Sequence, residues 1–339
     1  MEGYNKKVIM SYWTICRMKT TKKIYVKVSI IFLLGGILLF SSCEKEENQK
    51  IEANRKTLFM YLPWSSNLTN YFYNNISDLE KCITKIGLNN EKVIVFISTG
   101  STEAMMFEIV SSHGRCKREI LKKYKSPPFT TIDGITAILN DVKAFAPASV
   151  YTMIIGCHGM GWLPVYEMKV RSAPHMKMHW EYQGVPLTRY FGGLTAEYQT
   201  DIKSLASGIA NAGMKMEYIL FDDCYMSSIE VAYELKDVTK YLIGSTSEMM
   251  AYGMPYAAIG EYLLGNPDYQ SGCEEFYNFY STYEIMPCGT LAVTDCSELE
   301  NMAAIIKSIN SKYSFDKSLR GTIQRLDGYT PVIFYDFAD

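Results

Sequence analysis

Several features are scarce or missing in this 339-residue sequence, and each absence excludes a class of protein. No two cysteines have the CxxC spacing, which excludes zinc ribbons and thioredoxin-like redox motifs. Lysine and arginine (34 residues) nearly balance aspartate and glutamate (36 residues), for a net charge of −2. That balance lacks the basic excess typical of proteins that bind nucleic acid, so no nucleic-acid partner is expected.

An apolar run near the N-terminus is too short for a stable membrane-spanning helix. It extends over 13 residues, from Val28 to Phe40, whereas about 20 are needed to cross a bilayer. Lysines precede the run and a Ser-Ser-Cys sequence follows it, which is the order of a secretory signal. We therefore predict a signal peptide over residues 1–42, and a translation start at Met18 would give it a normal compact form.

The end of this run, Phe-Ser-Ser-Cys at residues 40–43, resembles a bacterial lipobox. The acidic stretch that follows resembles the surface-export signal of Bacteroidetes lipoproteins. This resemblance implies cleavage before Cys43, lipid on its thiol, and a tether over residues 43–54. The domain at 55–339 would then be exported and anchored to the outer membrane, at the cell surface or on the periplasmic side. Plain secretion with an unmodified Cys43 is the alternative.

An odd number of cysteines remains in the exported part of the chain. Once Cys16 of the leader and Cys43 are set aside, there are seven, at positions 82, 116, 157, 224, 273, 288 and 296. At least one thiol must therefore stay unpaired within a monomer, even in a compartment where disulfides form. A thiol kept reduced in such a compartment suggests a functional role.

Apolar strands and amphipathic helices alternate along the chain. Short apolar runs predict strands at 56–62, 92–98, 105–110, 151–156, 218–221 and 241–245. Helical spacing of apolar residues predicts helices at 68–86, 131–145, 201–212 and 227–235. The alternation predicts one α/β domain with a mainly parallel sheet covered on both faces, although 105–110 suits an antiparallel strand.

Two reactive side chains stand at the ends of predicted strands. Histidine is scarce, with four residues, and His158 directly follows one apolar strand, while Cys224 follows another. Because parallel strands end at a common edge of a sheet, we expect the imidazole and the thiol to meet there. An imidazole promotes the thiolate and later protonates a leaving amine. Taken singly, a buried cysteine or a strand-end histidine is more often structural.

The residues around this pair resemble the clostripain family of cysteine peptidases, in the caspase-like clan. The family motif His-Gly-x-Gly-Trp matches residues 158–162, which follow an apolar strand. The family motif around its cysteine matches Asp-Asp-Cys-Tyr-Met at 222–226 and Glu-Val-Ala-Tyr-Glu-Leu at 230–235. Shorter matches are Asn67-Leu68, Ser247-Glu248 and Gly253-Met254-Pro255-Tyr256. The resemblance runs from about residue 56 to the end, and it implies a caspase-like α/β/α sandwich.

This resemblance implies a cysteine endopeptidase that cleaves proteins or peptides after Arg or Lys through a thioacyl intermediate. Cys224 would be the nucleophile and His158 the general acid and base. The N–H groups of Gly159 and Cys224 would form the oxyanion hole. Asp222 would bind the basic substrate side chain, although a strand-end aspartate that caps the next helix is an equally good interpretation. The chemistry requires no cofactor, and calcium is implied only because some relatives need it.

Two departures from the family bear on activity. An acidic residue of the family is absent at Met254-Pro255, which predicts a weaker or altered preference for basic residues. The chain also ends at Asp339 within a segment that the family continues, which predicts a truncated C-terminus. The alternative function is therefore a catalytically silent, surface-exposed binding lipoprotein on the same fold.

Two further expectations concern the long irregular segment at 162–198. His175 and His179 are four residues apart, but no zinc-peptidase glutamate lies between them and Pro174 disfavours a long helix. We therefore predict no metal site. Some relatives are activated by cleavage between the histidine and the cysteine, so the resemblance implies self-cleavage in this segment, which offers basic sites at Lys169, Arg171, Lys177 and Arg189.

Overall fold

The computed structural model describes residues 54–65, 67–163, 165, 192–284, 287–328 and 332–337. The predicted signal peptide, Cys43, the tether up to residue 53, His175, His179 and the four basic cleavage sites lie outside these ranges. Within the ranges, no helix combines the length and the apolar character that crossing a membrane requires.

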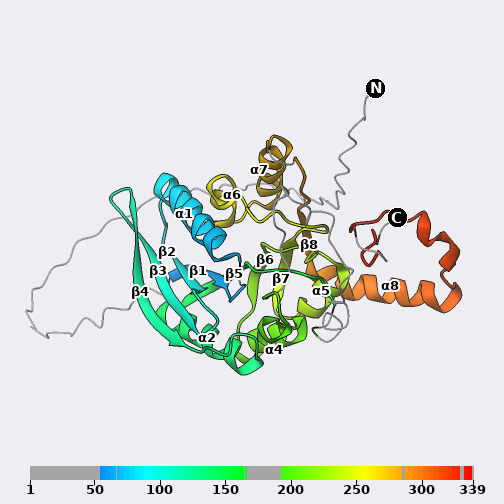
Figure 1. Cartoon of the computed structure of the whole chain (residues 1–339), viewed down its shortest axis with the longest axis horizontal. Helices are drawn as coiled ribbons and strands as arrows, with labels where there is room; N and C mark the ends of the chain where they lie inside the picture. Colours follow the sequence, from blue (N-terminus) through cyan, green and yellow to red (C-terminus); the bar gives the residue numbers. More distant parts are fainter. Residues whose placement is uncertain are drawn as a thin grey trace, which may run out of the picture. The chain divides into compact units, whose positions relative to one another are not determined.

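An eight-stranded sheet forms the centre of this part of the chain (Figure 1), in the order β4-β3-β2-β1-β5-β6-β7-β8. The five central strands pair in parallel, and they are β2 (Glu91–Ser98), β1 (Asn54–Leu62), β5 (Ala148–Ile155), β6 (Met216–Phe221) and β7 (Thr239–Gly244). The strands at the two edges pair antiparallel, and they are β3 (Glu103–Ser112), β4 (Arg115–Lys125) and β8 (Ala292–Asp295). The predicted mainly parallel sheet is confirmed.

Helices cover both faces of the sheet. One face carries α1 (Thr69–Ile86), α6 (Tyr256–Leu263) and α7 (Tyr269–Ser281). The other carries α2 (Ile132–Phe145), α4 (Ile202–Asn211) and α5 (Ile229–Leu235). The remaining helices are α8 (Leu299–Lys312) and the short 3₁₀ turns η1 (Ala196–Tyr198), η2 (Cys296–Glu298) and η3 (Lys317–Gly321). The α/β/α sandwich is therefore confirmed.

The central strands are apolar throughout because each of their faces meets a helix layer. Successive side chains of a strand point to opposite faces, so β1 contributes to two separate cores. Leu58 and Met60 join the core under α1, whereas Phe59 and Tyr61 join the core over α2. All four are almost completely buried. Continuous apolar runs, rather than alternating ones, are thus what this fold demands of its central strands.

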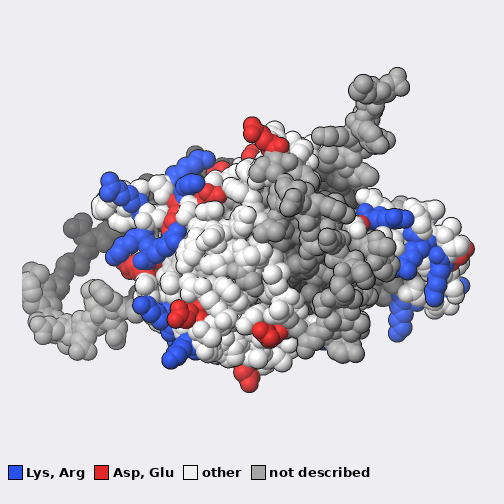
Figure 2. Space-filling view, viewed as in Figure 1, with Lys and Arg blue, Asp and Glu red and all other residues white. Residues whose placement is uncertain are grey.

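The sequence does not predict β4, because this strand has no apolar pattern. Most of its residues are exposed, and basic side chains occur along its whole length. They are Arg115, Lys117, Arg118, Lys122, Lys123 and Lys125. Figure 2 shows basic side chains, with carboxylates between them, over the part of the molecule where Figure 1 places β4. Lysine-rich edge strands resist the addition of a further strand, which explains this composition.

The connections bring four strand ends together. The chain leaves β1 towards Asn67, β5 towards His158, β6 towards Cys224, and β7 into residues 245–255, here called the β7–α6 loop. These strands are parallel neighbours, so their carboxyl ends share one edge of the sheet. The candidate site is built at this edge.

Candidate active site

His158 is held from two directions at the end of β5. The residue is only 1% exposed. Its backbone N–H donates to the carbonyl of Gly192 at 3.1 Å. Its imidazole Nε2 lies 2.8 Å from Oδ1 of Asn67, which follows the neighbouring strand β1. The backbone and the ring are therefore both positioned by hydrogen bonds to other segments.

Cys224, also 1% exposed, is held by the β7–α6 loop. The N–H of Met249 donates to Sγ across 3.2 Å, and Sγ lies 3.6 Å from the carbonyl oxygen of the same residue. The carbonyl accepts from a protonated thiol, whereas the N–H stabilises a thiolate. Met249 therefore offers a hydrogen-bond partner to both forms of the Cys224 side chain, including the nucleophilic thiolate.

Gly159 brings the loop after His158 into direct contact with the loop that carries Cys224. A Cβ atom on Gly159 would lie 2.3 Å from the carbonyl oxygen of Cys224 and 3.0 Å from its nitrogen. Side-chain carbons do not approach backbone atoms this closely, so only glycine fits at this position. The backbones that follow β5 and β6 are thus packed against each other, next to the predicted nucleophile.

A buried carboxylate fastens the same two loops. Oδ1 of Asp223 accepts from the backbone N–H of Cys157 at 2.5 Å, and Oδ2 lies 3.5 Å from the Cys157 thiol, which donates to it. Both residues are fully buried. Charge-assisted hydrogen bonds of this kind are about twice as strong as neutral ones. Asp223 precedes Cys224 and Cys157 precedes His158, so this contact fixes the distance between the two loops.

Asp222 is buried with its carboxylate facing the segment at the end of the β7–α6 loop. Oδ1 accepts from the N–H of Met254 at 2.8 Å, and Oδ2 accepts from the Tyr256 hydroxyl at 3.0 Å. The next helix, α5, is capped instead by Ser228, whose side chain accepts from Val231 N–H. The helix-capping interpretation of Asp222 is therefore wrong, because another residue performs that task.

A C-terminal segment packs on the residue that follows Cys224. Tyr225 has a positive φ of 59°, and its ring stacks on Phe334 with centroids 4.4 Å apart and planes at 5°. The Tyr225 hydroxyl donates to Glu248 at 2.6 Å. Phe334 is buried, and its ring also lies beside Gly161 in the loop after His158. Residues near the end of the chain thus support both loops of the site.

Three neighbours of the predicted site residues have no role that the sequence predicts. Asn67 contacts His158, Met249 contacts Cys224, and Tyr256 contacts Asp222. These contacts join positions 91, 25 and 34 residues apart. Asn67 and Tyr256 belonged to the short matches with the family, which was the only signal in the sequence.

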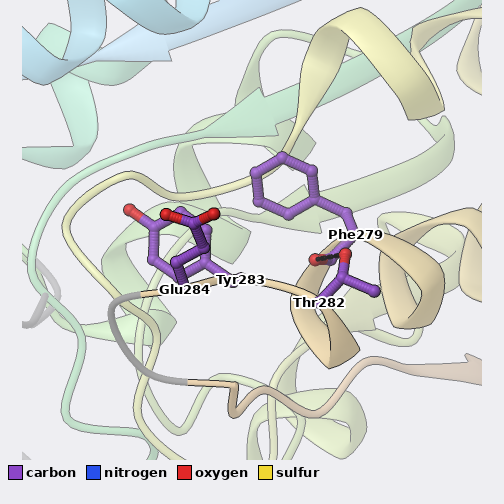
Figure 3. Close-up of a pocket in the computed structure, with 4 residues that line it drawn as sticks. All are labelled: Phe279, Thr282, Tyr283 and Glu284. Carbon is purple, nitrogen blue, oxygen red and sulfur yellow. Dashed lines mark hydrogen bonds between the residues drawn. The ribbon is translucent and has the colours of Figure 1, made fainter.

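A hollow of about 360 Å³ lies at the end of α7, next to the β7–α6 loop. It is lined by Phe279, Thr282, Tyr283 and Glu284 (Figure 3). Tyr252 of the loop stacks on the Phe279 ring, with centroids 5.2 Å apart. The predicted catalytic residues do not line this hollow. Its aromatic side chains pack against the β7–α6 loop instead.

The other thiols differ in environment. Burial raises the pKa of Cys82, Cys273 and Cys296 to about 11, so they are almost fully protonated at neutral pH. None of the seven cysteines in the described ranges forms a disulfide with another. Within the same ranges, no group of three or more His, Cys, Asp or Glu residues is arranged to hold a metal ion.

A sandwich whose parallel strands end in a histidine and a cysteine, with the two loops in contact, has the architecture of a caspase-like cysteine peptidase. The model of the clostripain family matches residues 60–335. The chain belongs to this family and is a cysteine peptidase.

Several solved structures resemble the chain, among them three C11 proteases. A secreted C11 cysteine protease from Bacteroides thetaiotaomicron, "iotapain", is 60% identical with a TM-score of 0.77, over 85% of this chain and 79% of that one. An inactive zymogen C11 protease from Parabacteroides distasonis is 25% identical with a TM-score of 0.68, over 84% and 75%. A secreted C11 cysteine protease from B. thetaiotaomicron with an irreversible peptide inhibitor is 20% identical, with a TM-score of 0.64 over 80% and 73%, and it supports the fold alone. A comparison with the curated proteins gave no match.

Proposed function

We propose that this peptidase hydrolyses peptide bonds after Arg or Lys with a dyad of Cys224 and His158. The observation that carries the proposal is the contact of Gly159 with the Cys224 backbone, which joins the two strand ends. The 60% identity to a secreted C11 cysteine protease supports the same chemistry. Proteins or peptides are the proposed substrates.

The proposed reaction begins when His158 takes the thiol proton of Cys224 and the thiolate attacks the substrate carbonyl carbon. The N–H groups of Gly159 and Cys224 stabilise the resulting oxyanion, and one such donor contributes about 3 kcal/mol. The imidazolium then protonates the leaving amine as the C–N bond breaks, leaving a thioacyl intermediate. Water, deprotonated by the imidazole, hydrolyses that intermediate and restores the thiol. These steps require no cofactor, and a calcium requirement stays a prediction of the family resemblance.

Asp222 is the proposed partner of the substrate's basic side chain. Its carboxylate is buried, and it is oriented by the Met254 N–H and the Tyr256 hydroxyl. A buried carboxylate pairs strongly with a guanidinium or ammonium group, because little water competes for the charge. The loss of the family's acidic residue at Met254-Pro255 leaves Asp222 as the proposed source of the negative charge.

The proposed location of the enzyme is the outer membrane, to which the exported chain is anchored through Cys43. The relative at 60% identity is described as secreted, which agrees with an exported chain. A lipid on Cys43 would hold the catalytic domain at the outer membrane.

The alternative function, a silent binding lipoprotein, is favoured by one observation. The Cys224 side chain is almost completely buried, so substrate can reach it only after neighbouring residues move. One similar structure is described as an inactive zymogen. Activation by cleavage between His158 and Cys224 would reconcile the buried thiol with peptidase activity.

Fluorogenic peptides with Arg, Lys or a neutral residue before the scissile bond test the proposed activity. We expect hydrolysis of the Arg and Lys peptides by the wild type and background rates from Cys224→Ala and His158→Ala. Cys288→Ala, which removes an exposed thiol, is the matched control and should stay active. Equal rates in the wild type and Cys224→Ala would refute the dyad, and equal rates on neutral peptides would refute the specificity.

The same variant tests activation by self-cleavage. Purified wild type should be cut between residues 158 and 224, whereas purified Cys224→Ala should stay intact, as mass spectrometry of the fragments would show. Cleavage of pure Cys224→Ala would refute self-processing.

A further inference from the structure

The two nitrogens of the His158 ring have different surroundings. Nε2 lies 2.8 Å from Oδ1 of Asn67. Asn67 itself is exposed, whereas His158 is only 1% exposed. The other ring nitrogen, Nδ1, is also buried. A neutral imidazole carries its proton on only one of these nitrogens, so what each nitrogen meets decides which one is the base.

An amide oxygen only accepts hydrogen bonds, so the contact with Asn67 Oδ1 requires a proton on Nε2. The lone pair is then on Nδ1, and Nδ1 becomes the nitrogen able to take a proton from a thiol. When the ring is doubly protonated during the reaction, the same oxygen still accepts from Nε2. One contact therefore suits both states of the catalytic cycle.

Two residues that flank Asn67, Ser65 and Leu68, are anchored in the protein interior. Ser65 is fully buried, and its hydroxyl donates to the carbonyl of Pro63 at 2.8 Å. Leu68 is fully buried in the core, and its carbonyl accepts from Phe72 N–H at 3.0 Å, at the start of α1. Anchored residues on either side limit where the Asn67 side chain can move, whereas a free water molecule at Nε2 has no such restriction.

We propose that Asn67 is a positioning residue, which orients the His158 ring and keeps its proton on Nε2 so that Nδ1 serves Cys224. This inference rests on the proposed dyad and adds a third side chain to it. Asn67 acts through the imidazole and not on the substrate.

Kinetics of two variants test the proposal. Asn67→Ala should lower kcat about 10²-fold, because the imidazole is no longer held in the orientation needed for proton transfer. KM should change little. Asn67→Asp places a carboxylate beside Nε2, which favours the imidazolium, so the limb of the pH–rate profile that reports the imidazole should move to higher pH. A residue that merely holds the loop would not move that limb.

Asn54→Ala is the matched control, since Asn54 lies at the opposite end of β1 and its amide donates to the Pro147 carbonyl at 3.2 Å. It should leave kcat and the pH profile unchanged. A kcat of Asn67→Ala within about twofold of the wild type would overturn the proposal, given that misplacement by 1 Å costs far more. An unmoved limb in Asn67→Asp would also overturn it.

A spectroscopic test separates this inference from the proposed activity. The ¹⁵N shifts of labelled histidine, with His158 assigned from a His158→Ala spectrum, report which ring nitrogen carries the proton. We expect an Nε2–H ring in the wild type and loss of that preference in Asn67→Ala; an Nδ1–H ring in the wild type refutes the inference. The wild type could also lack peptidase activity and still show an Nε2–H ring that is lost in Asn67→Ala. That outcome would refute the peptidase proposal but support the role of Asn67 in orienting the ring.

Discussion

Two consecutive aspartates beside Cys224 have different partners, although their sequence context is the same. Asp223 binds the backbone of Cys157 and thereby joins the ends of β5 and β6. Asp222 faces the opposite way, towards Met254 and Tyr256. Side chains alternate in direction along extended backbone, so neighbours at a strand end reach different loops. We assign the structural task to Asp223 and the substrate-binding task to Asp222.

Asp222→Asn should abolish the preference for basic residues. The amide keeps nearly the same shape but loses the charge that pairs with a guanidinium or ammonium group. We expect kcat/KM for Arg and Lys peptides to fall about 10²-fold, or roughly 3 kcal/mol of transition-state stabilisation, with little change for neutral peptides. Parallel assays of the three peptides give the ratio directly.

Tyr256→Phe is the control for this change, because it removes one hydrogen bond to Asp222 and keeps the charge. This variant should retain the preference for Arg and Lys. An unchanged ratio of basic to neutral hydrolysis in Asp222→Asn would show that another group binds the substrate side chain.

At the scale of elements, the β7–α6 loop contacts three residues of the segment that carries the thiol. The Ser247 carbonyl accepts from Tyr225, the Met249 N–H donates to Cys224, and the Met254 N–H donates to Asp222. As the loop runs forward, its contacts run backward along residues 225–222. The loop therefore positions the nucleophile and the proposed specificity residue together, and a change in its path would alter both.

A second contact between elements joins β1 to the end of α6. Lys56 is almost completely buried, and its Nζ donates to the carbonyls of Leu263 and Gly265 at 2.5 and 3.3 Å. Burial lowers the pKa of Lys56 from 10.5 to about 8, although Glu91 nearby opposes the shift. The carbonyls at a helix C-terminus attract a cation, but they do not cancel the desolvation cost.

This lowered pKa predicts how stability changes with pH. Between about pH 8 and 10.5 the unfolded chain holds a proton on Lys56 that the folded chain has released, so stability rises with pH. The gain is about 3 kcal/mol at most. Urea unfolding at both ends of this window should show the rise in the wild type, beyond any rise in Lys56→Met.

Other groups also titrate in this window, and the comparison of the two proteins removes their contribution. The difference in unfolding free energy between wild type and Lys56→Met should become more favourable to the wild type as pH rises. A difference that stays flat from pH 8 to 10.5 would contradict a lowered pKa for Lys56.

At the scale of the whole molecule, the proposed lipid on Cys43 sets where the domain works. An anchor with more than one acyl chain is stable, whereas a single chain binds a membrane only marginally. We expect the wild type in the membrane fraction of the producing bacterium and Cys43→Ser in the soluble exported fraction. Immunoblots of separated fractions make this measurement.

Cys288→Ser is the matched control for the anchor, since it removes an exposed cysteine of the domain and leaves position 43 intact. Its distribution should equal that of the wild type. Membrane retention of Cys43→Ser would contradict lipid attachment at this residue.

The sequence by itself determined the α/β class, the central strands and the two motifs around His158 and Cys224. Central strands such as β1 and β2 are detectable because burial on both faces demands an unbroken apolar run. The motif glycine Gly159 is also explained by packing, because the close approach of two backbones leaves no room for a side chain. Such requirements restrict the residue type at the position itself, so the local sequence records them.

Only the tertiary structure decided which side chains surround the pair. The edge strand β4 escaped prediction because exposed basic residues have no apolar period, and Asp222 could not be separated from a helix cap until Ser228 was seen to cap α5. Asn67 meets the His158 ring across 91 positions, and no periodicity in the chain encodes that distance. Contacts of this kind arise from the spatial order of the strands in the sheet, which places β1 beside β5, and this order is a property of the folded chain.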